Sequence, residues 1–316
     1  MILRGINAGG DSKLPPFEPF SSEASADQIA SMGMNAVRYC AVWEAIEPEK
    51  GRYDERHLDR MEEIVGWLTR RGIYVLIDMH QDLWSRAFAG SGAPAWTTPE
   101  VDRQQLLRPD GGPEWFFNYP SDPVCDAFER FWHDGELQSH FCEAVRRVAQ
   151  RFAGNDLVIG YEIWNEPWQG RRNVHSGEFE EKYLAPFYEK VIAAIRENDP
   201  RAIVFLEPAL LAAGLFTTQS HLPRFAAQNL VYAPHYYPTG ALLGTVTDIE
   251  AALKDFDQNL VLVGEKADQL GATPLLGEFG FHPRQPDGER FLRGFYDALD
   301  RHLMSATVLT YALRDL

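Results

Sequence analysis

The stretch Tyr161-Glu162-Ile163-Trp164-Asn165-Glu166-Pro167-Trp168 places a carboxylate at the end of an apolar run that begins at Leu157. Proline lacks the N–H that a strand ladder needs, so we expect Pro167 to end this strand just past Glu166. Barrel enzymes keep their chemistry at the carboxyl ends of buried parallel strands. Glu166 is therefore a candidate catalytic residue on the fourth of a series of strands.

Short apolar, β-branched runs alternate with helical patterns along all 316 residues. The runs are continuous rather than alternating, which is typical of parallel strands buried on both faces. Eight strands with helices between them predict an α/β fold, a single (β/α)8 TIM barrel domain over 1–316, rather than an open doubly wound sheet. The predicted strands are Ile2–Asn7, Asn35–Trp43, Tyr74–Gln81, Val158–Glu166, Ala202–Pro208, Leu230–Tyr237, Pro274–Gly280 and Ala306–Leu313.

Two irregularities interrupt this pattern. From about 82 to 120 the chain has no sustained period but is rich in aromatic residues, and so long a connection is usually functional. Only Arg314, Asp315 and Leu316 follow the last predicted strand, so we expect the final helix to be lacking. The outer faces of strands eight and one would then be uncovered, which favours self-association through them.

Composition narrows the choice of partners. The formal net charge is -16, which disfavours binding to the phosphates of nucleic acid. No apolar run approaches the ~18 residues of a membrane span, so we expect no integral membrane protein. No signal peptide is visible, which predicts a cytoplasmic protein as the chain stands, or a secreted one if a signal has been removed. The three cysteines are expected to be buried thiols.

A second carboxylate also lies at the end of an apolar run. Glu278 lies in Pro274-Leu-Leu-Gly-Glu-Phe-Gly280, at the end of the seventh predicted strand. A buried charge is costly without partners, so two glutamates within apolar strands need a reason. Catalysis by a retaining glycosidase is such a reason. These enzymes use two carboxyls about 5–5.5 Å apart, one as acid and base and one as nucleophile. Glu166 and Glu278 are expected to face each other across the barrel mouth.

Other strand ends carry polar residues suited to the same site. Arg38 is a cation in an otherwise uncharged strand, and beside Glu278 it would hold that carboxylate ionised. His80 and Asp82 close the third strand and could bind sugar hydroxyls. Metal binding by His80 and Asp82 is the alternative, and we expect no metal and no cofactor.

The fourth and sixth strands complete the predicted site. Asn165 is suited to bind the substrate 2-hydroxyl, a contact that strengthens in the transition state. His235 is expected beside Glu166, where it would modulate the acid, and the Tyr237 hydroxyl is expected to hydrogen-bond the nucleophile.

In order and spacing, these residues resemble glycoside hydrolase family 5, a family of clan A TIM-barrel retaining glycosidases. The opening Arg4-Gly-Ile-Asn-Ala-Gly-Gly-Asp-Ser-Lys-Leu-Pro-Pro-Phe17 and the run Asp78-Met-His-Gln-Asp82 are similar to its endoglycoceramidase-like branch. The resemblance implies Glu166 as acid/base, Glu278 as nucleophile, and Lys13 with Asp82 as ligands of the sugar. It implies double-displacement cleavage of a β-glucosidic or β-galactosidic bond in a carbohydrate, and the glycolipids of the branch are a candidate substrate.

The chain departs from the family in three places. No tryptophan occurs after Trp168, whereas the family places one at the end of strand eight, and Tyr311 is the available substitute. The final helix and the C-terminal β-sandwich of glycosphingolipid-cleaving members are missing. Three alternatives stay open: an endo-β-1,4-glucanase-type hydrolase, a catalytically impaired sugar-binding barrel, and a metal-dependent barrel hydrolase that uses His80, Asp82, His235 and a glutamate.

Overall fold

A closed parallel barrel forms the centre of the molecule in the computed structural model, which describes residues 1–316 apart from 10, 99–102, 109–114, 173–176, 212–218 and 310–316. The strand order is β6-β5-β4-β3-β2-β1-β9-β8-β7, and a further pairing of β6 with β8 closes the sheet. The described strands are β1 (Arg4–Ala8), β2 (Ala36–Val42), β3 (Tyr74–His80), β4 (Val158–Glu162), β5 (Ile203–Leu206), β6 (Leu230–Tyr232), β7 (His235–Tyr236), β8 (Thr273–Phe279) and β9 (Ser305–Val308). The predicted (β/α)8 barrel is confirmed.

Two strand predictions need correction. The predicted strand Leu230–Tyr237 is two short strands, β6 and β7, because Pro234 between them cannot donate to the ladder. The fourth strand ends at Glu162 rather than at Glu166. Glu166 itself takes a left-handed backbone conformation with φ of 45°, which no β-strand accommodates.

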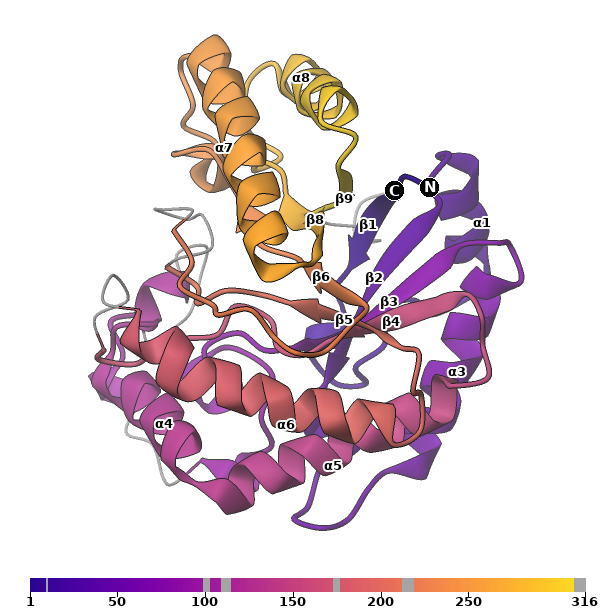
Figure 1. The fold of residues 1–316 in the computed structure, drawn as a ribbon, viewed down its shortest axis with the longest axis vertical. Helices are drawn as coiled ribbons and strands as arrows, with labels where there is room; N and C mark the ends of the chain where they lie inside the picture. The colour runs from indigo at the N-terminus through magenta and orange to yellow at the C-terminus, as the bar shows by residue number, and fades with distance from the viewer. Residues whose placement is uncertain (10, 99–102, 109–114, 173–176, 212–218, 310–316) are drawn as a thin grey trace.

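The helices lie outside the barrel, where their apolar stripes pack on the strands. The described α-helices are α1 (Ala24–Ser31), α2 (Trp43–Ile46), α3 (Glu55–Thr69), α4 (Asp122–His133), α5 (Gly135–Phe152), α6 (Ala185–Arg196), α7 (Ile249–Leu270) and α8 (Gly288–Arg301). Asp54, Asp134 and Asp248 cap the first turns of α3, α5 and α7. In Figure 1, α3, α5 and α6 cover one side of the barrel, and α7 and α8 cover β8 and β9.

The inside of the barrel changes character along its axis. A separate apolar cluster, drawn from residues on or next to strands, fills one end, and it includes Ala36, Leu76 and Phe205. Side chains two residues apart on a strand point the same way. Two residues further along these strands stand Arg38, Asp78 and Glu207, all fully buried. The barrel therefore has an apolar bottom and a charged layer towards its carboxyl ends.

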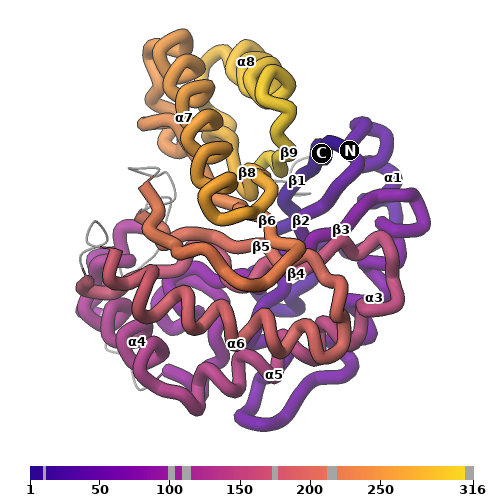
Figure 2. Tube along the Cα trace, viewed as in Figure 1, coloured from indigo at the N-terminus to yellow at the C-terminus, as the bar shows by residue number. Residues whose placement is uncertain are grey.

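The last described strand, β9, pairs with the first strand, β1. Figure 2 traces β9 to a position beside β1, and Ala306 pairs with Arg4 in the parallel register. The expected absence of a final helix and the substitute Tyr311 concern residues 310–316, which lie outside the described residues. Within the described part of the chain, no helix is long and apolar enough to cross a membrane.

Candidate active site

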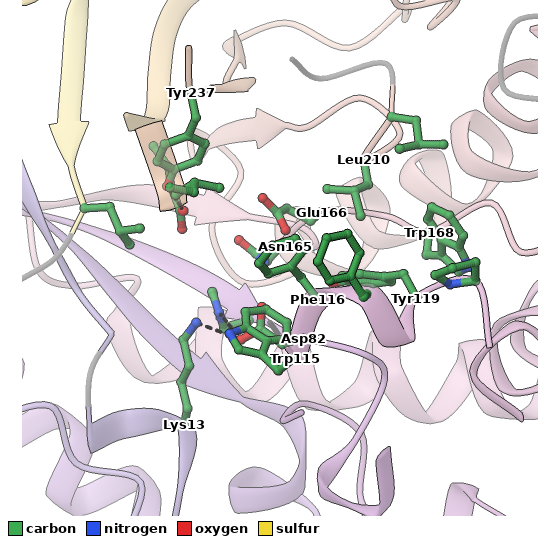
Figure 3. Close-up of a pocket in the computed structure, with 17 residues that line it drawn as sticks. Lys13, Asp82, Trp115, Phe116, Tyr119, Asn165, Glu166, Trp168, Leu210 and Tyr237 are labelled. Atoms are coloured by element: carbon green, nitrogen blue, oxygen red, sulfur yellow. Dashed lines mark hydrogen bonds and ion pairs between the residues drawn. The ribbon is translucent and has the colours of Figure 1, made fainter. Parts of the chain in front are cut away.

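A cavity of about 400 Å³ opens at the carboxyl ends of the strands (Figure 3). Seven of the nine residues predicted for the site line it, and these are Lys13, His80, Asp82, Asn165, Glu166, Tyr237 and Glu278. The other two, Arg38 and His235, are buried and lie behind the lining residues, in contact with the carboxylates. The sequence thus identified residues that the fold brings together from five strands or their ends and from the turn after β1.

The two candidate catalytic carboxylates lie close together. A carboxylate oxygen of Glu166, one of Glu278 and a ring nitrogen of His235 all lie within 4.8 Å of one another. Retaining glycosidases hold their two carboxyls about 5–5.5 Å apart, whereas inverting enzymes leave about 6.5–9.5 Å for a water molecule. The pair therefore has the spacing of a retaining site.

Glu278 is held as a carboxylate. Arg38 Nη1 donates to its Oε1 at 2.8 Å, and the Tyr237 hydroxyl donates to its Oε2 at 2.6 Å. Burial alone would raise the pKa of Glu278, but the positive charges of His235 and Arg38 lower it to about 2. Glu278 is therefore ionised at neutral pH, as a nucleophile must be.

Glu166 has a different environment. His235 Nδ1 lies 2.9 Å from its Oε1, so the contact expected between these two residues is present. In the described part of the chain, the guanidinium of Arg38 donates to Glu278 but not to Glu166. His235 Nδ1 is also 3.7 Å from Glu278 Oε2, so the imidazole lies between the two carboxylates and closer to Glu166. Only Glu278 also accepts hydrogen bonds from a guanidinium and a phenol among the described residues. Such asymmetry separates the roles of paired carboxylates.

A chain of polar contacts forms the side of the cavity near β3. Lys13 Nζ donates to Asp82 Oδ2 at 2.7 Å, His80 Nε2 lies 3.3 Å from the same oxygen, and His80 Nδ1 lies 2.6 Å from Asp78 Oδ2. Burial opposes ionisation of Asp82, but Lys13 and His80 hold its pKa well below the ordinary value. This fixed row of charges faces the cavity, where it can bind sugar hydroxyls.

Asn165 is fixed by its neighbours. Its Oδ1 accepts from Arg38 Nη2 at 2.8 Å, and its Nδ2 donates one hydrogen to the Gln81 carbonyl at 2.9 Å. The second amide hydrogen has no acceptor among the described residues, and Asn165 lines the cavity, where a ligand can accept it. We refer to Lys13, Asp82, Asn165, Glu166 and Glu278 as the charged floor.

Much of the remaining cavity lining is apolar. We call it the apolar wall, and it consists of Trp115, Phe116, Phe117, Leu210, Leu211 and Leu242. The aromatic insertion has two roles in the structure. Trp84 and Phe88 are fully buried in the main core, whereas Trp115 and Phe116 face the cavity (Figure 3). Phe117 also lines the cavity.

Sequence reasoning missed the carboxylates beneath the floor. Asp78, Glu162 and Glu207 are all fully buried and lie within 3.2 Å of Arg38. Glu207 could have been found, because Leu206-Glu207-Pro208 repeats the pattern of a carboxylate that ends an apolar run before proline. Asp78 and Glu162 share a second signal, an acidic residue inside a run that is otherwise apolar.

Three groups of described residues bring metal-ligating atoms within 4.8 Å of one another. One contains Glu278, one contains Glu162 and Glu207, and the third contains Asp78, which pairs with Arg38 at 3.1 Å. These carboxylates already hydrogen-bond or pair with Arg38. A divalent cation there would be repelled at short range by the guanidinium. The arrangement does not fit a metal centre.

The fold and the site together define the class of protein: a (β/α)8 barrel with two carboxylates at its mouth, arranged as in retaining glycoside hydrolases. The sequence model described as Cellulase (glycosyl hydrolase family 5) matches residues 3–307. The chain belongs to glycoside hydrolase family 5, and the family expected from the sequence is confirmed.

Similar proteins point to one branch of the family. The chain is 29% identical to endoglycoceramidase I of Rhodococcus hoagii (strain 103S) over 267 residues, which cover 80% of this chain and 53% of that protein. Two solved structures of endo-glycoceramidase II from Rhodococcus sp. are each 32% identical and cover 98% of this chain. Its lactosyl-enzyme intermediate matches with a TM-score of 0.86 over 73% of that chain, and its ganglioside GM3 complex with 0.87 over 74%. The chain spans about half the length of the first curated relative.

Proposed function

We propose that this chain is a retaining β-glycoside hydrolase that cleaves a β-glucosidic or β-galactosidic bond, and that the barrel over 1–316 is its catalytic domain. One observation carries the proposal: a carboxylate kept ionised by Arg38 stands within 4.8 Å of a second carboxylate at the barrel mouth. That pairing supplies both groups that double displacement needs.

In the first step, the Glu278 carboxylate attacks the anomeric carbon. The bond from that carbon to the leaving oxygen breaks, and Glu166 gives its proton to this oxygen. Asn165 donates to the sugar 2-hydroxyl, and the row from Lys13 to Asp82 binds further hydroxyls of the same ring. The product of this step is a glycosyl ester on Glu278 and a free aglycone alcohol.

In the second step, Glu166 acts as a base. It takes a proton from water, the water oxygen attacks the anomeric carbon from the side that the aglycone left, and the ester bond to Glu278 breaks. The sugar leaves with the configuration that it had in the substrate, and Glu166 is protonated again.

The aglycone is proposed to be a lipid. The apolar wall stands beside the carboxylates and presents three aromatic rings and three leucines where the leaving group would lie. Binding sites for apolar groups are lined in this way, with few polar groups to fix orientation. The endoglycoceramidases among the similar proteins support the same substrate class.

A substrate panel tests this proposal. Nitrophenyl β-glucoside and β-galactoside are compared with glucosylceramide, galactosylceramide, lactosylceramide and cello-oligosaccharides. We expect turnover of one or more glycosylceramides, with retained configuration at the anomeric carbon seen by NMR. Turnover of cello-oligosaccharides alone would assign an endo-glucanase, and binding without any turnover would assign a sugar-binding barrel.

The self-association expected through β9 and β1 remains a prediction. Sedimentation velocity over a range of protein concentrations checks it, because a purely monomeric profile would contradict it.

A further inference from the structure

The backbone of Glu166 is unusual for a residue with a side chain. Its φ of 45° lies in the left-handed region, which residues other than glycine, asparagine and aspartate seldom adopt. Such conformations persist only where the surrounding structure over-determines them, and they cluster at active sites. The contacts that fix the Glu166 peptide are therefore part of how the carboxylate is aimed.

Two side chains fix that peptide from opposite sides. Glu207 Oε2 accepts the Glu166 backbone N–H at 2.9 Å. Gln81 Nε2 donates to the carbonyls of Asn165 and Glu166, at 2.8 and 3.0 Å. The N–H and the C=O of Glu166 are thus both bound by side chains rather than by a strand ladder.

Glu207 also reaches the Glu166 side chain through a histidine. His235 Nε2 lies 2.9 Å from Glu207 Oε1, and His235 Nδ1 lies 2.9 Å from Glu166 Oε1. One oxygen of Glu207 therefore accepts the Glu166 backbone N–H, and the other lies at ion-pair distance from the imidazole that contacts the Glu166 carboxylate. The His235–Glu207 contact does not have hydrogen-bond geometry, so its contribution is electrostatic.

The environment of Glu207 suits it to hold Glu166 in place. Its side chain is fully buried, and its backbone carbonyl accepts the Tyr188 hydroxyl at 2.7 Å. Neutralising Arg38 does not require it, because Glu162 lies closer to that guanidinium, at 2.5 Å against 3.2 Å. Burial and the neighbouring Glu162 raise the pKa of Glu207 well above its ordinary value.

We propose that Glu207 is a positioning residue for the acid/base Glu166, which it holds through the Glu166 backbone N–H and through His235. The inference rests on the proposed function, since it assigns a residue to that same reaction. It predicts a defect in the two events that Glu166 carries out, and none in the attack by Glu278.

This defect has a chemical signature. A dinitrophenyl leaving group needs no proton, so glycosylation of the enzyme by such a substrate is independent of the acid. An alkyl or lipid leaving group needs the proton. Azide attacks the glycosyl-enzyme without a base and so restores the second step when the base is misplaced.

The test is Glu207→Gln, with Glu47→Gln as its matched control. Glu47 is also fully buried, accepts the Gly51 N–H at 2.8 Å and faces a histidine, His140 Nδ1 at 2.6 Å. Neither Glu47 nor those partners line the cavity. The control therefore reproduces the loss of a buried carboxylate at a distance from the reaction.

For Glu207→Gln we expect kcat/KM on an alkyl or lipid glycoside to fall about a hundredfold, the usual size of a general-acid effect. On the dinitrophenyl glycoside kcat/KM should change less than about threefold, and azide should raise kcat and give a glycosyl azide. Glu47→Gln should lower the melting temperature while leaving both substrates and the azide response unchanged.

Equal losses on both substrates, or no response to azide, would overturn the proposal and assign Glu207 a general structural role. If Glu207→Gln does not fold, Glu207→Asp serves as the second variant. Failure of both to reach a native circular dichroism spectrum, while Glu47→Gln folds, would overturn the proposal too. If the unaltered protein cleaves no glycoside at all, the proposed function fails first.

Discussion

The charged floor and the apolar wall meet in one cavity but are built in different ways. The floor comes largely from strand ends, and beneath it Arg38 lies within 3.2 Å of four carboxylates. The wall comes from the connections between strands and helices, including the insertion after β3, and among the described residues its side chains form no network of ion pairs. The floor is suited to the chemistry and the sugar, and the wall to the group that leaves.

The largest expected effect separates the two carboxylates of the floor. Glu278→Ala should lower kcat by roughly a thousandfold or more, because the covalent route is lost. With a dinitrophenyl β-glycoside and azide, this variant should give the α-glycosyl azide, whereas Glu166→Ala should give the β-glycosyl azide. NMR of the products distinguishes them, and the reverse pattern would exchange the two assigned roles.

Lowering the pH should reduce the stability that the charged floor contributes and leave the contribution of the apolar wall unchanged. The pKa of Glu278 is lowered to about 2, so its stabilising contribution is complete above the unfolded value of about 4.5 and is lost as the pH falls towards 2. The contribution is on the order of 3 kcal/mol. The pKa of Glu207 is raised, so its contribution to the free energy of unfolding falls as the pH rises, opposite to that of Glu278.

Urea unfolding of the parent and of Glu278→Gln between pH 2 and 7 isolates the Glu278 contribution, because the Glu207 slope is common to both. The difference between the two curves should shrink below pH 4.5. A difference that stays constant over this range would contradict the ionised state assigned to Glu278.

The next effect tests whether the floor recognises the sugar. Lys13→Met should lower kcat/KM by roughly tenfold to a hundredfold, since a charged contact to the substrate is lost. The loss should be the same for nitrophenyl and lipid glycosides, which share the sugar. Arg86→Met is the control, because Arg86 also pairs with a carboxylate, Glu44, but does not line the cavity.

The smallest effect concerns the wall. Trp115→Ala should raise KM for a glycosylceramide about tenfold and change KM for a nitrophenyl glycoside less than about twofold. Trp96→Ala is the matched control from the same insertion, since Trp96 packs on Trp43 and His140 outside the cavity. Equal effects of Trp115→Ala on both substrates would assign the wall to the sugar rather than to the lipid.

The comparison also explains what the sequence could reveal. Glu166, Glu278, His80 and His235 were predictable because each is a polar residue at or near the end of an apolar run, and barrel topology brings such ends together. Arg38 was predictable as a cation inside an otherwise uncharged strand. Lys13 came only from the family resemblance, because it lies in a loop. In the aromatic insertion, Trp84 lies in the core and Trp115 at the cavity. No sequence periodicity distinguishes the two, so the structure was needed to place them.

The local backbone conformation at Glu166 was also not predictable from the sequence. Nothing in the sequence predicted that Glu166 leaves the strand with a positive φ, and therefore nothing predicted the need for Glu207 and Gln81 around it. The sequence has Glu-Pro at the end of two apolar runs, Glu166-Pro167 and Glu207-Pro208. Only the pairing of β4 with β5 shows that these two ends are neighbours.

Covalent trapping tests the central claim most directly. A 2-deoxy-2-fluoro β-glycoside with a dinitrophenyl leaving group is incubated with the protein, which is then digested and examined by mass spectrometry. We predict a single fluoroglycosyl adduct on the peptide that contains Glu278, with hydrolytic activity lost in step with labelling. An adduct on Glu166, or turnover with no adduct on either carboxylate, would contradict the account.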